Sequence, residues 1–457
     1  MSFLGNQGPS QKRLYIAVAA WIVLVIVGGF CTWYGFFGPG GKTGEQATET
    51  PAAADSSTAP ETATSAPADA PAETSAPGGD TEAGDVQPVP TTAAAAPAAP
   101  PAEEAFGYGI AVHGVVGNAE YTMGQVESLG LGWVKQQVRW AHFEGNPGQM
   151  DWSGFDWVVE EANKRGIKVM FSVVDAPHWS RTYFDDNVEG APPDDLALFA
   201  DFLGRMVDRY QGRIHAIEVW NEQNLDREWD TAEGVSPEQY VEMLRLAYQA
   251  IKSRDPNIIV ISGALSPVGS SHSDGDRVIW MDDFLYFDRM VAAGFLNYCD
   301  CVGAHHNGYN IPPNVATGDP YQDANAEFRG FWDTPDDHEW SFKTTLWGYH
   351  ERIAAAGSDK PLCVTEFGWA SAEGLGGHPP GFEFALDNTL EEQAQWIVEA
   401  FQLMREWGFV RIAFLWNLDY GQKDGLGPTD PNAPYSLLDF QGVDRPAYGA
   451  VGAMEKP

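Results

Sequence analysis

Basic residues are scarce in this chain of 457 residues, which has 27 Lys and Arg against 64 Asp and Glu and a formal net charge of -37 at pH 7. Proteins that bind nucleic acid need clustered Lys and Arg to displace counterions from the phosphates. The composition therefore argues against a nucleic-acid partner. A strongly acidic surface also favours solubility and repels polyanions.

Cysteine is scarce as well, with 4 residues in the whole chain, so the fold is not a disulfide scaffold. Cys31 lies in an apolar run, and the bulky Phe30 before it argues against lipidation. We expect Cys299, Cys301 and Cys363 to be buried thiols. A bridge between Cys301 and Cys363 is the alternative in an oxidising compartment, because both fall on strands that we place side by side.

Charge is absent from residues 14–37, a run long enough, at about 1.5 Å rise per residue, to cross a hydrocarbon core of about 30 Å as a helix. Lys12 and Arg13 precede this run, so the positive-inside rule places residues 1–13 in the cytoplasm. A cleaved signal peptide is the alternative, but no small-x-small site follows the run immediately. We expect a single-pass anchor in the cell membrane, with the rest of the chain extracytoplasmic.

Large apolar side chains are almost absent from residues 38–104, which are dominated by Ala, Pro, Thr, Ser, Glu and Asp. Such a segment buries too little surface to offset the entropy lost on ordering. It is predicted to be a disordered linker, either a spacer through a cell envelope or an unselected connection.

From Phe106 onward, short β-rich runs alternate with helical patterns, which is typical of parallel βαβ units. The alternation predicts an α/β fold, a (β/α)8 TIM barrel over residues 105–457 that we expect to be monomeric. Helical signals support it: Ser236 and Pro237 suit the start of a helix, and Gly166 suits a helix end directly before a strand. The first six strands begin near Gly107, Trp133, Lys168, Ile214, Ile258 and Asp300, and the last two are 361–366 and 411–416.

Polar side chains stand where several of these strands end, and in a barrel of this kind the C-terminal strand ends open onto the mouth. Two of them, Glu222 and Glu366, end strands four and seven, which face each other across a closed barrel of eight strands. Retaining glycosidases use two carboxyl groups about 5 to 5.5 Å apart, one as acid and one as nucleophile. The alternative is that each glutamate closes an unrelated ion pair.

The sequence around each glutamate resembles a known group of enzymes. Residues 217–225 read IEVWNEQNL and residues 364–369 read VTEFGW. Together they resemble clan A glycoside hydrolases such as families 5 and 39, and the similarity spans residues 106 to 457. The resemblance implies hydrolysis of β-glycosidic bonds with retention through a covalent glycosyl-enzyme intermediate, with Glu222 as acid/base and Glu366 as nucleophile.

The neighbouring residues suggest how the two glutamates are tuned. Arg139, at the end of strand two, is our candidate for the cation that keeps Glu366 ionised. Glu222 must hold a proton near neutral pH, which desolvation and the Glu366 anion would both promote. Asn221 could donate to the sugar 2-hydroxyl, where hydrogen bonds strengthen in the transition state, or could simply form a turn. Glu218 is read as structural, paired with a buried cation.

Several further residues are expected to bind the carbohydrate substrate, each with barrel-mouth packing as the alternative. Trp416 offers a flat face for a sugar ring, and the resemblance places a Trp at this position in many clan members. Trp179 and Trp369 are weaker candidates for such stacking. The remaining candidates are His178, His305, His306 and Tyr309.

No metal or organic cofactor is predicted. Residues 274–276 read DGD but lack the remaining ligand spacing of a calcium loop. The pair His305 and His306 lacks the companion ligands of a zinc site. Two other functions remain open: a non-catalytic surface protein that binds carbohydrate, and a transglycosylase that uses the same intermediate.

Overall fold

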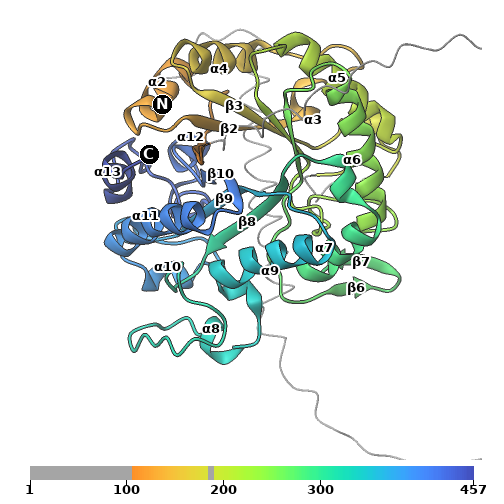
Figure 1. Ribbon diagram of the computed structural model, residues 1–457. Coiled ribbons are helices and arrows are strands. Elements are labelled where there is room, and N and C mark those ends of the chain that lie inside the picture. The colour runs from red at the N-terminus through yellow and green to blue at the C-terminus, as the bar shows by residue number, and fades with distance from the viewer. Residues whose placement is uncertain (1–104, 184–189) are drawn as a thin grey trace, which may run out of the picture. The chain divides into compact units, whose positions relative to one another are not determined.

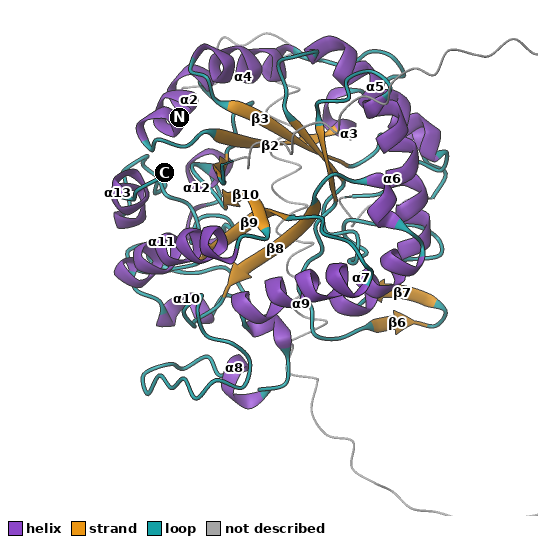
Figure 2. Cartoon of the chain, in the orientation of Figure 1, coloured by secondary structure: helices purple, strands orange, loops and turns teal. Residues whose placement is uncertain are grey.

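The computed structural model describes residues 105–183 and 190–457, and its centre is a ring of parallel strands surrounded by helices (Figures 1 and 2). The predicted anchor at 14–37 and linker at 38–104 lie outside the described residues. Within the described ranges, no helix combines the length and the apolar character needed to cross a membrane. The parallel strands are β1 Gly107–Ala111, β2 Trp133–Arg139, β3 Lys168–Val174, β4 Ala216–Val219, β5 Ile259–Ser262, β8 Val302–Gly308, β9 Leu362–Trp369 and β10 Val410–Leu415.

The eight strands pair in the order β5-β4-β3-β2-β1-β10-β9-β8, and a parallel bridge between Ile261 and Cys301 joins the two outer strands. Gly303 allows this last junction to be close, because a Cβ added there would lie 2.0 Å from the carbonyl oxygen of Ser262. The sheet therefore curls into a barrel, and the predicted (β/α)8 architecture is confirmed. All eight predicted strands are present, with boundaries shifted by a few residues.

Amphipathic helices cover the outside of the barrel. The predicted start of α6 is confirmed, since the Ser236 side chain accepts from the N–H of Gln239 and Pro237 is the first helical residue. Gly166 has a φ of 70°, the left-handed conformation that ends α4 directly before β3. The covering helices are α2 Ala119–Ser128, α4 Ser153–Lys164, α5 Leu196–Tyr210, α6 Pro237–Lys252, α7 Asp283–Ala292, α9 Phe342–Ala355, α11 Leu390–Trp407 and α13 Pro446–Ala453.

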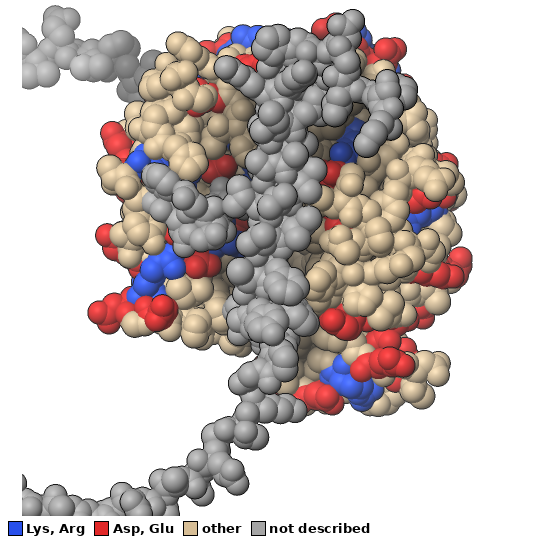
Figure 3. Space-filling model, turned by 180° about the vertical axis from the view of Figure 1, so that it is seen from behind, with Lys and Arg blue, Asp and Glu red and all other residues tan. Residues whose placement is uncertain are grey.

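Short elements occupy the loops between strands and helices. The residues at 274–276 turn a hairpin between β6 His272–Asp274 and β7 Arg277–Trp280. The β8–α9 connection contains α8 Gly330–Asp333 and extends beyond the ring of helices (Figure 1). The other short helices are α3 Trp140–Phe143, α10 Phe384–Asp387 and α12 Tyr420–Asp424. Asp and Glu side chains are spread over the face drawn in Figure 3, as the net charge leads one to expect.

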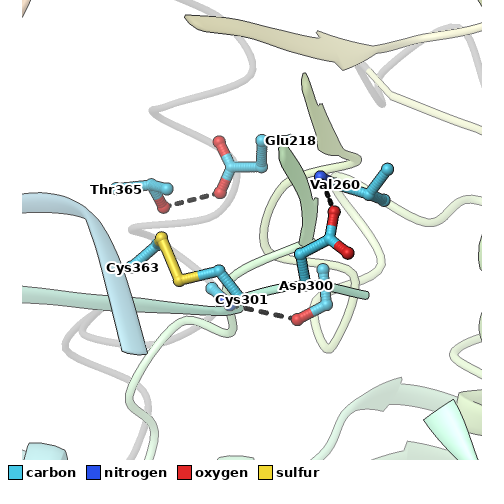
Figure 4. Close-up of a disulfide and its surroundings, with 8 residues drawn as sticks. Glu218, Val260, Asp300, Cys301, Cys363 and Thr365 are labelled. Atoms are coloured by element: carbon cyan, nitrogen blue, oxygen red, sulfur yellow. Dashed lines mark hydrogen bonds between the residues drawn. A yellow bond between two sulfur atoms is a disulfide. The ribbon is translucent and has the colours of Figure 1, made fainter. Parts of the chain in front are cut away.

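The lower interior of the barrel is apolar and contains a disulfide between Cys301 and Cys363 (Figure 4). Cys301 directly precedes β8 and Cys363 is the second residue of β9. The prediction of buried thiols is therefore wrong for them, and the alternative of a bridge is confirmed. Cys299 is a free buried thiol, and burial raises its pKa to about 12. The surrounding layer consists of Trp133, Met170, Ala216, Ile261, Ile412 and Phe414.

Candidate active site

A β-bulge in β9 aims the side chain of Glu366. Across β8 and β9, Ala304 pairs with Val364 and His305 pairs with Glu366, which leaves Thr365 as an extra residue. A bulge of this kind redirects side chains and is common beside active sites. As a result Thr365 and Glu366, although adjacent in sequence, both point into the barrel and contact polar partners there.

The backbone at the end of β4 is strained where it presents Glu222. Trp220 and Glu222 have φ values of 79° and 47°, in the left-handed region that non-glycine residues seldom occupy. Each such residue costs roughly 1–3 kcal/mol, and these residues cluster at functional sites. The Glu222 N–H donates to the carbonyl of Ala264 at 2.8 Å, which fixes this turn against the next strand.

His305 lies between the two predicted catalytic carboxylates. Its Nδ1 is 3.2 Å from Oε1 of Glu222, and its Nε2 is 3.8 Å from Oε1 of Glu366. The imidazole is fully buried, which lowers the pKa of His305, but the carboxylates of Glu366 and Glu222 more than compensate and raise it overall. One side chain therefore contacts both glutamates, so the imidazole of His305 links the two carboxylates.

Lys135, in the middle of β2, supplies the cation beside Glu366. Its Nζ is 2.9 Å from Oε1 of Glu366 and 3.2 Å from Oε2 of Glu218, and all three side chains are almost fully buried. Burial lowers the pKa of Lys135, but the two carboxylates raise it above its ordinary value, so the amine is charged. Sequence reasoning assigned this position to Arg139, which lies four residues further along the same strand, at its end.

The prediction that Glu218 pairs with a buried cation is confirmed, and the cation is Lys135. The hydroxyl of Thr365 donates to Oε1 of Glu218 at 2.6 Å, close to the disulfide (Figure 4). Burial raises the pKa of Glu218, but Lys135 and His305 outweigh it and hold the carboxyl below its ordinary value. Glu218 is thus an anion that positions Lys135 beneath Glu366.

Glu222 is held as an anion in this structure, contrary to the expectation that it keeps its proton. Burial raises its pKa, but the guanidinium of Arg227 and the hydrogen bond to His305 lower it to about 2. Arg227 donates to Oε2 while His305 contacts Oε1. The prediction named desolvation and the Glu366 anion as the controlling influences and missed both cations.

Two asparagines lie beside the glutamates. Asn221, predicted to contact the substrate, is 5% exposed, and its Oδ1 has no hydrogen-bond partner among the described residues. Asn307, which was not predicted, donates from Nδ2 to Oε2 of Glu366 at 3.4 Å. Strand alternation was the available signal for Asn307, since it is two residues after His305 on β8.

The other residues predicted to bind the substrate are aromatic residues and histidines, and the structure gives each of them different partners. Trp416 is half-buried and packs at 4.7 Å from the ring of Tyr420. Tyr309 lies 4.7 Å from Trp340, and burial together with nearby carboxylates, including that of Glu222, raises its pKa. Of the remaining predicted residues, Trp179 and Trp369 donate to backbone carbonyls, His306 is buried against the carbonyl of Glu339, and His178 is exposed after β3.

A group of acidic and histidine side chains near α7 has a spacing that could suit a metal ion, namely Asp282, Asp283 and His338. Asp283 is fully buried and already engaged, because Oδ1 accepts from the N–H of Val268 at 2.9 Å and Oδ2 accepts from the Tyr349 hydroxyl at 2.6 Å. These contacts identify the group as a structural link between α7 and α9.

Solved glycoside hydrolases share this fold. A family 39 glycoside hydrolase from the gut symbiont Bacteroides cellulosilyticus WH2 matches with a TM-score of 0.55 and 18% identity, over 77% of this chain and 63% of that protein. A monomeric β-xylosidase from Caulobacter crescentus CB15 matches with a TM-score of 0.50 and 18% identity, over 77% and 67% of the two chains. A glucosidase from Croceicoccus marinus matches with a TM-score of 0.51 and 14% identity, over the same shares.

At these identities the likeness concerns the fold, and the chain spans less than two thirds of the length of the family 39 protein. No protein-family model and no curated protein sequence matches the chain. The predicted resemblance to clan A glycoside hydrolases is confirmed at the level of this fold.

Proposed function

We propose that this chain is a retaining glycoside hydrolase that cleaves β-glycosidic bonds in oligo- or polysaccharides. The observation that carries the proposal is the position of His305, which contacts both the carboxylate of Glu222, after β4, and that of Glu366, in β9. Two carboxylates converging on one site are what double displacement at a sugar carbon requires. The shared fold of a β-xylosidase and a glucosidase supports the same class.

In the first step Glu366, ionised beside Lys135, attacks the anomeric carbon while Glu222 gives a proton to the leaving oxygen. A covalent glycosyl ester of Glu366 forms and the leaving-group sugar departs. In the second step Glu222 takes a proton from water, which attacks the same carbon and releases Glu366. In this proposal Asn221, the residue before Glu222, donates to the sugar 2-hydroxyl, and Trp416 stacks on a sugar ring.

The test uses the full chain, a screen of aryl β-glycosides, and the variants Glu366→Ala and Glu222→Ala. Loss of the nucleophile should lower turnover by roughly 10³-fold or more. Added azide should then yield an α-glycosyl azide with Glu366→Ala, because azide takes the place of the nucleophile. With Glu222→Ala it should yield a β-glycosyl azide, because azide attacks the glycosyl-enzyme intermediate from the opposite face of the sugar. Equal turnover by the wild type and Glu366→Ala would refute the assignment.

Product analysis separates the other uses of such a site. A transglycosylase would transfer the glycosyl group to an added sugar acceptor rather than to water. A non-catalytic binding protein would retain glycans across a broad panel without cleaving any of them.

We further propose that the barrel is extracytoplasmic and anchored by residues 14–37. The uncharged run behind Lys12 and Arg13 supports an anchor. The disulfide between Cys301 and Cys363 supports an oxidising compartment, because cytosolic thiols are kept reduced. Protease added to intact cells stripped of their outer envelope should digest the barrel and leave a membrane-bound N-terminal fragment. Protection of the barrel until the membrane is lysed would contradict this topology, and a mature chain that begins after residue 37 would identify a signal peptide.

A further inference from the structure

Arg227 covers the acid/base from the solvent side. It belongs to the loop between β4 and α6, and its Nη2 donates to Oε2 of Glu222. The Arg227 side chain is 62% exposed, whereas that of Glu222 is 11% exposed. His305 holds the other oxygen of Glu222 from inside the barrel. The carboxylate of Glu222 is thus held between a buried imidazole and a mostly exposed guanidinium.

The backbone on both sides of Arg227 is fixed. The N–H of Asp226 donates to the carbonyl of Ile279 at 2.8 Å, and the Asp226 carboxylate pairs with Arg277 at 3.2 Å. On the other side, Nε1 of Trp220 donates to the carbonyl of Glu228 at 2.8 Å. The part of this loop best able to move is therefore the long side chain of Arg227 itself.

This contact conflicts with the role of Glu222 in the proposed function. A general acid must carry a proton and must reach the leaving oxygen of the substrate. Here Glu222 is ionised, and Arg227 occupies the oxygen from which the proton would be given. The Arg227 guanidinium must therefore leave Glu222 before the first step. Because Glu222 protonates the leaving oxygen in the proposed function, the displaced guanidinium stays within reach of the leaving-group sugar.

We propose that Arg227 is a specificity residue of the leaving-group subsite, which exchanges Glu222 for a carboxylate on the leaving-group sugar and thereby selects β-glycosides of uronic acids. The inference rests on the proposed glycosidase function. A substrate carboxylate replaces one charge-assisted hydrogen bond of the guanidinium by another. A neutral leaving-group sugar offers only hydroxyl groups, so the same displacement loses a stronger interaction than it gains.

The exchange also prepares the acid. Removing a cation from Glu222 and bringing a second anion near it both favour the protonated carboxyl, which then takes a proton from water and gives it to the leaving oxygen. The other groups that face Glu222 remain in place during this exchange: His305 in contact, with Tyr309 and Tyr435 nearby and Glu366 beyond the imidazole. The net charge of -37 does not prevent binding of a single carboxylate, because exposed charges further than about 8 Å away are largely screened at physiological salt.

The experiment compares two disaccharides that share the glycone found by the substrate screen and differ in the leaving-group sugar, glucuronate or glucose. The wild type should cleave the glucuronate compound with a kcat/KM at least about 10-fold higher than the glucose compound. This factor is expected because the loss of one charge-assisted hydrogen bond changes affinity by about that much. Arg227→Gln should lose this preference, and Arg227→Lys should retain part of it. Arg245→Gln is the matched control, since Arg245 pairs with Glu242 on the outer helix α6, and it should behave as the wild type.

A pH profile gives a second readout that a purely structural role would not change. The kcat/KM profile reports the ionisation of the free enzyme, and without the guanidinium the carboxyl of Glu222 stays protonated to higher pH. The basic limb of Arg227→Gln on the glucose compound should therefore move up by roughly one pH unit or more. Equal preference in the wild type and Arg227→Gln, or superimposable basic limbs, overturns the inference while the Glu366-dependent hydrolysis stands. If the Glu366→Ala variant hydrolyses these substrates as fast as the wild type, the proposed function is overturned instead.

Discussion

The amine of Lys135 lies 2.9 Å from Oε1 of Glu366, inside a barrel where both side chains are almost fully buried. This pair joins β2 to β9, across 231 residues of sequence. The same amine contacts Glu218 at 3.2 Å, so one cation serves two buried carboxylates. Without this amine, both carboxylates would be buried with no cationic partner, which is strongly destabilising.

Lys135→Met should therefore lower both activity and stability. We expect a loss of roughly 3–5 kcal/mol in the free energy of unfolding, the usual effect of removing one partner of a buried ion pair. In any folded fraction, kcat should fall because Glu366 has lost the cation that favours its ionised form. Urea unfolding and kinetics with aryl β-glycosides measure the two effects.

Lys168→Met is the matched control for this variant, because Lys168 is exposed on β3 and packs over the ring of Trp133. The double variant Lys135→Met/Glu218→Gln should recover part of the lost stability, since one of the two unpaired anions is gone. A Lys135→Met variant as stable and active as the wild type would contradict the role assigned to Lys135.

The disulfide should stabilise the barrel by closing a loop across 62 residues of sequence. Loop-closure entropy predicts a loss of about 4 kcal/mol in the free energy of unfolding for Cys301→Ala/Cys363→Ala. Cys299→Ala, which removes the buried free thiol, is the control and should cost much less. Thiol alkylation of the denatured wild type should label Cys31 and Cys299 before reduction and all four cysteines after it, and four reactive thiols beforehand would exclude the bridge.

Stability should depend on pH through Glu222. Its pKa is lowered from an ordinary value of 4.5 to about 2 in the folded chain, so its contribution is fully present above pH 4.5 and is lost as pH falls from 4.5 towards 2. The variant Glu222→Gln lacks this titration, so its unfolding midpoint in urea should fall less steeply over that window. Because Arg227 is mostly exposed, added salt should reduce the difference.

Glu351→Gln, a change at an exposed position on α9, is the control for that pH series and should follow the wild-type curve. Parallel curves for the wild type and Glu222→Gln between pH 4.5 and 2 would show that the ion pair and the hydrogen bond of Glu222 do not stabilise the fold.

Asn221 should act through the 2-hydroxyl of the substrate. Asn221→Ala is expected to lower kcat/KM by about 10- to 100-fold on ordinary β-glycosides, because hydrogen bonds to this hydroxyl strengthen in the transition state. The matching 2-deoxy glycoside lacks the acceptor, so the wild type and the variant should cleave it at similar rates. An equal loss on both substrates would point instead to a disturbed turn at the end of β4.

The sequence by itself determined the barrel and the two glutamates. Alternating apolar runs define strands and helices locally, and eight such strands have few ways to bury both faces. Once the barrel is accepted, polar residues near the C-terminal ends of the strands, such as Glu222 and Glu366, are the candidates for the mouth, because parallel strands all end on the same side. The motifs around these residues were therefore sufficient to nominate them.

Only the tertiary structure decided which cations serve those glutamates. Strand alternation allowed both Lys135 and Arg139 to face inward, and the depth within the barrel, which selects Lys135, depends on the stagger between strands. Arg227 reaches Glu222 through the conformation of a loop, and the disulfide depends on the spacing of two strand starts. Local patterns fix periodicity, whereas ionisation depends on neighbours that are distant in sequence, so the protonation state of Glu222 could not be predicted correctly from the sequence.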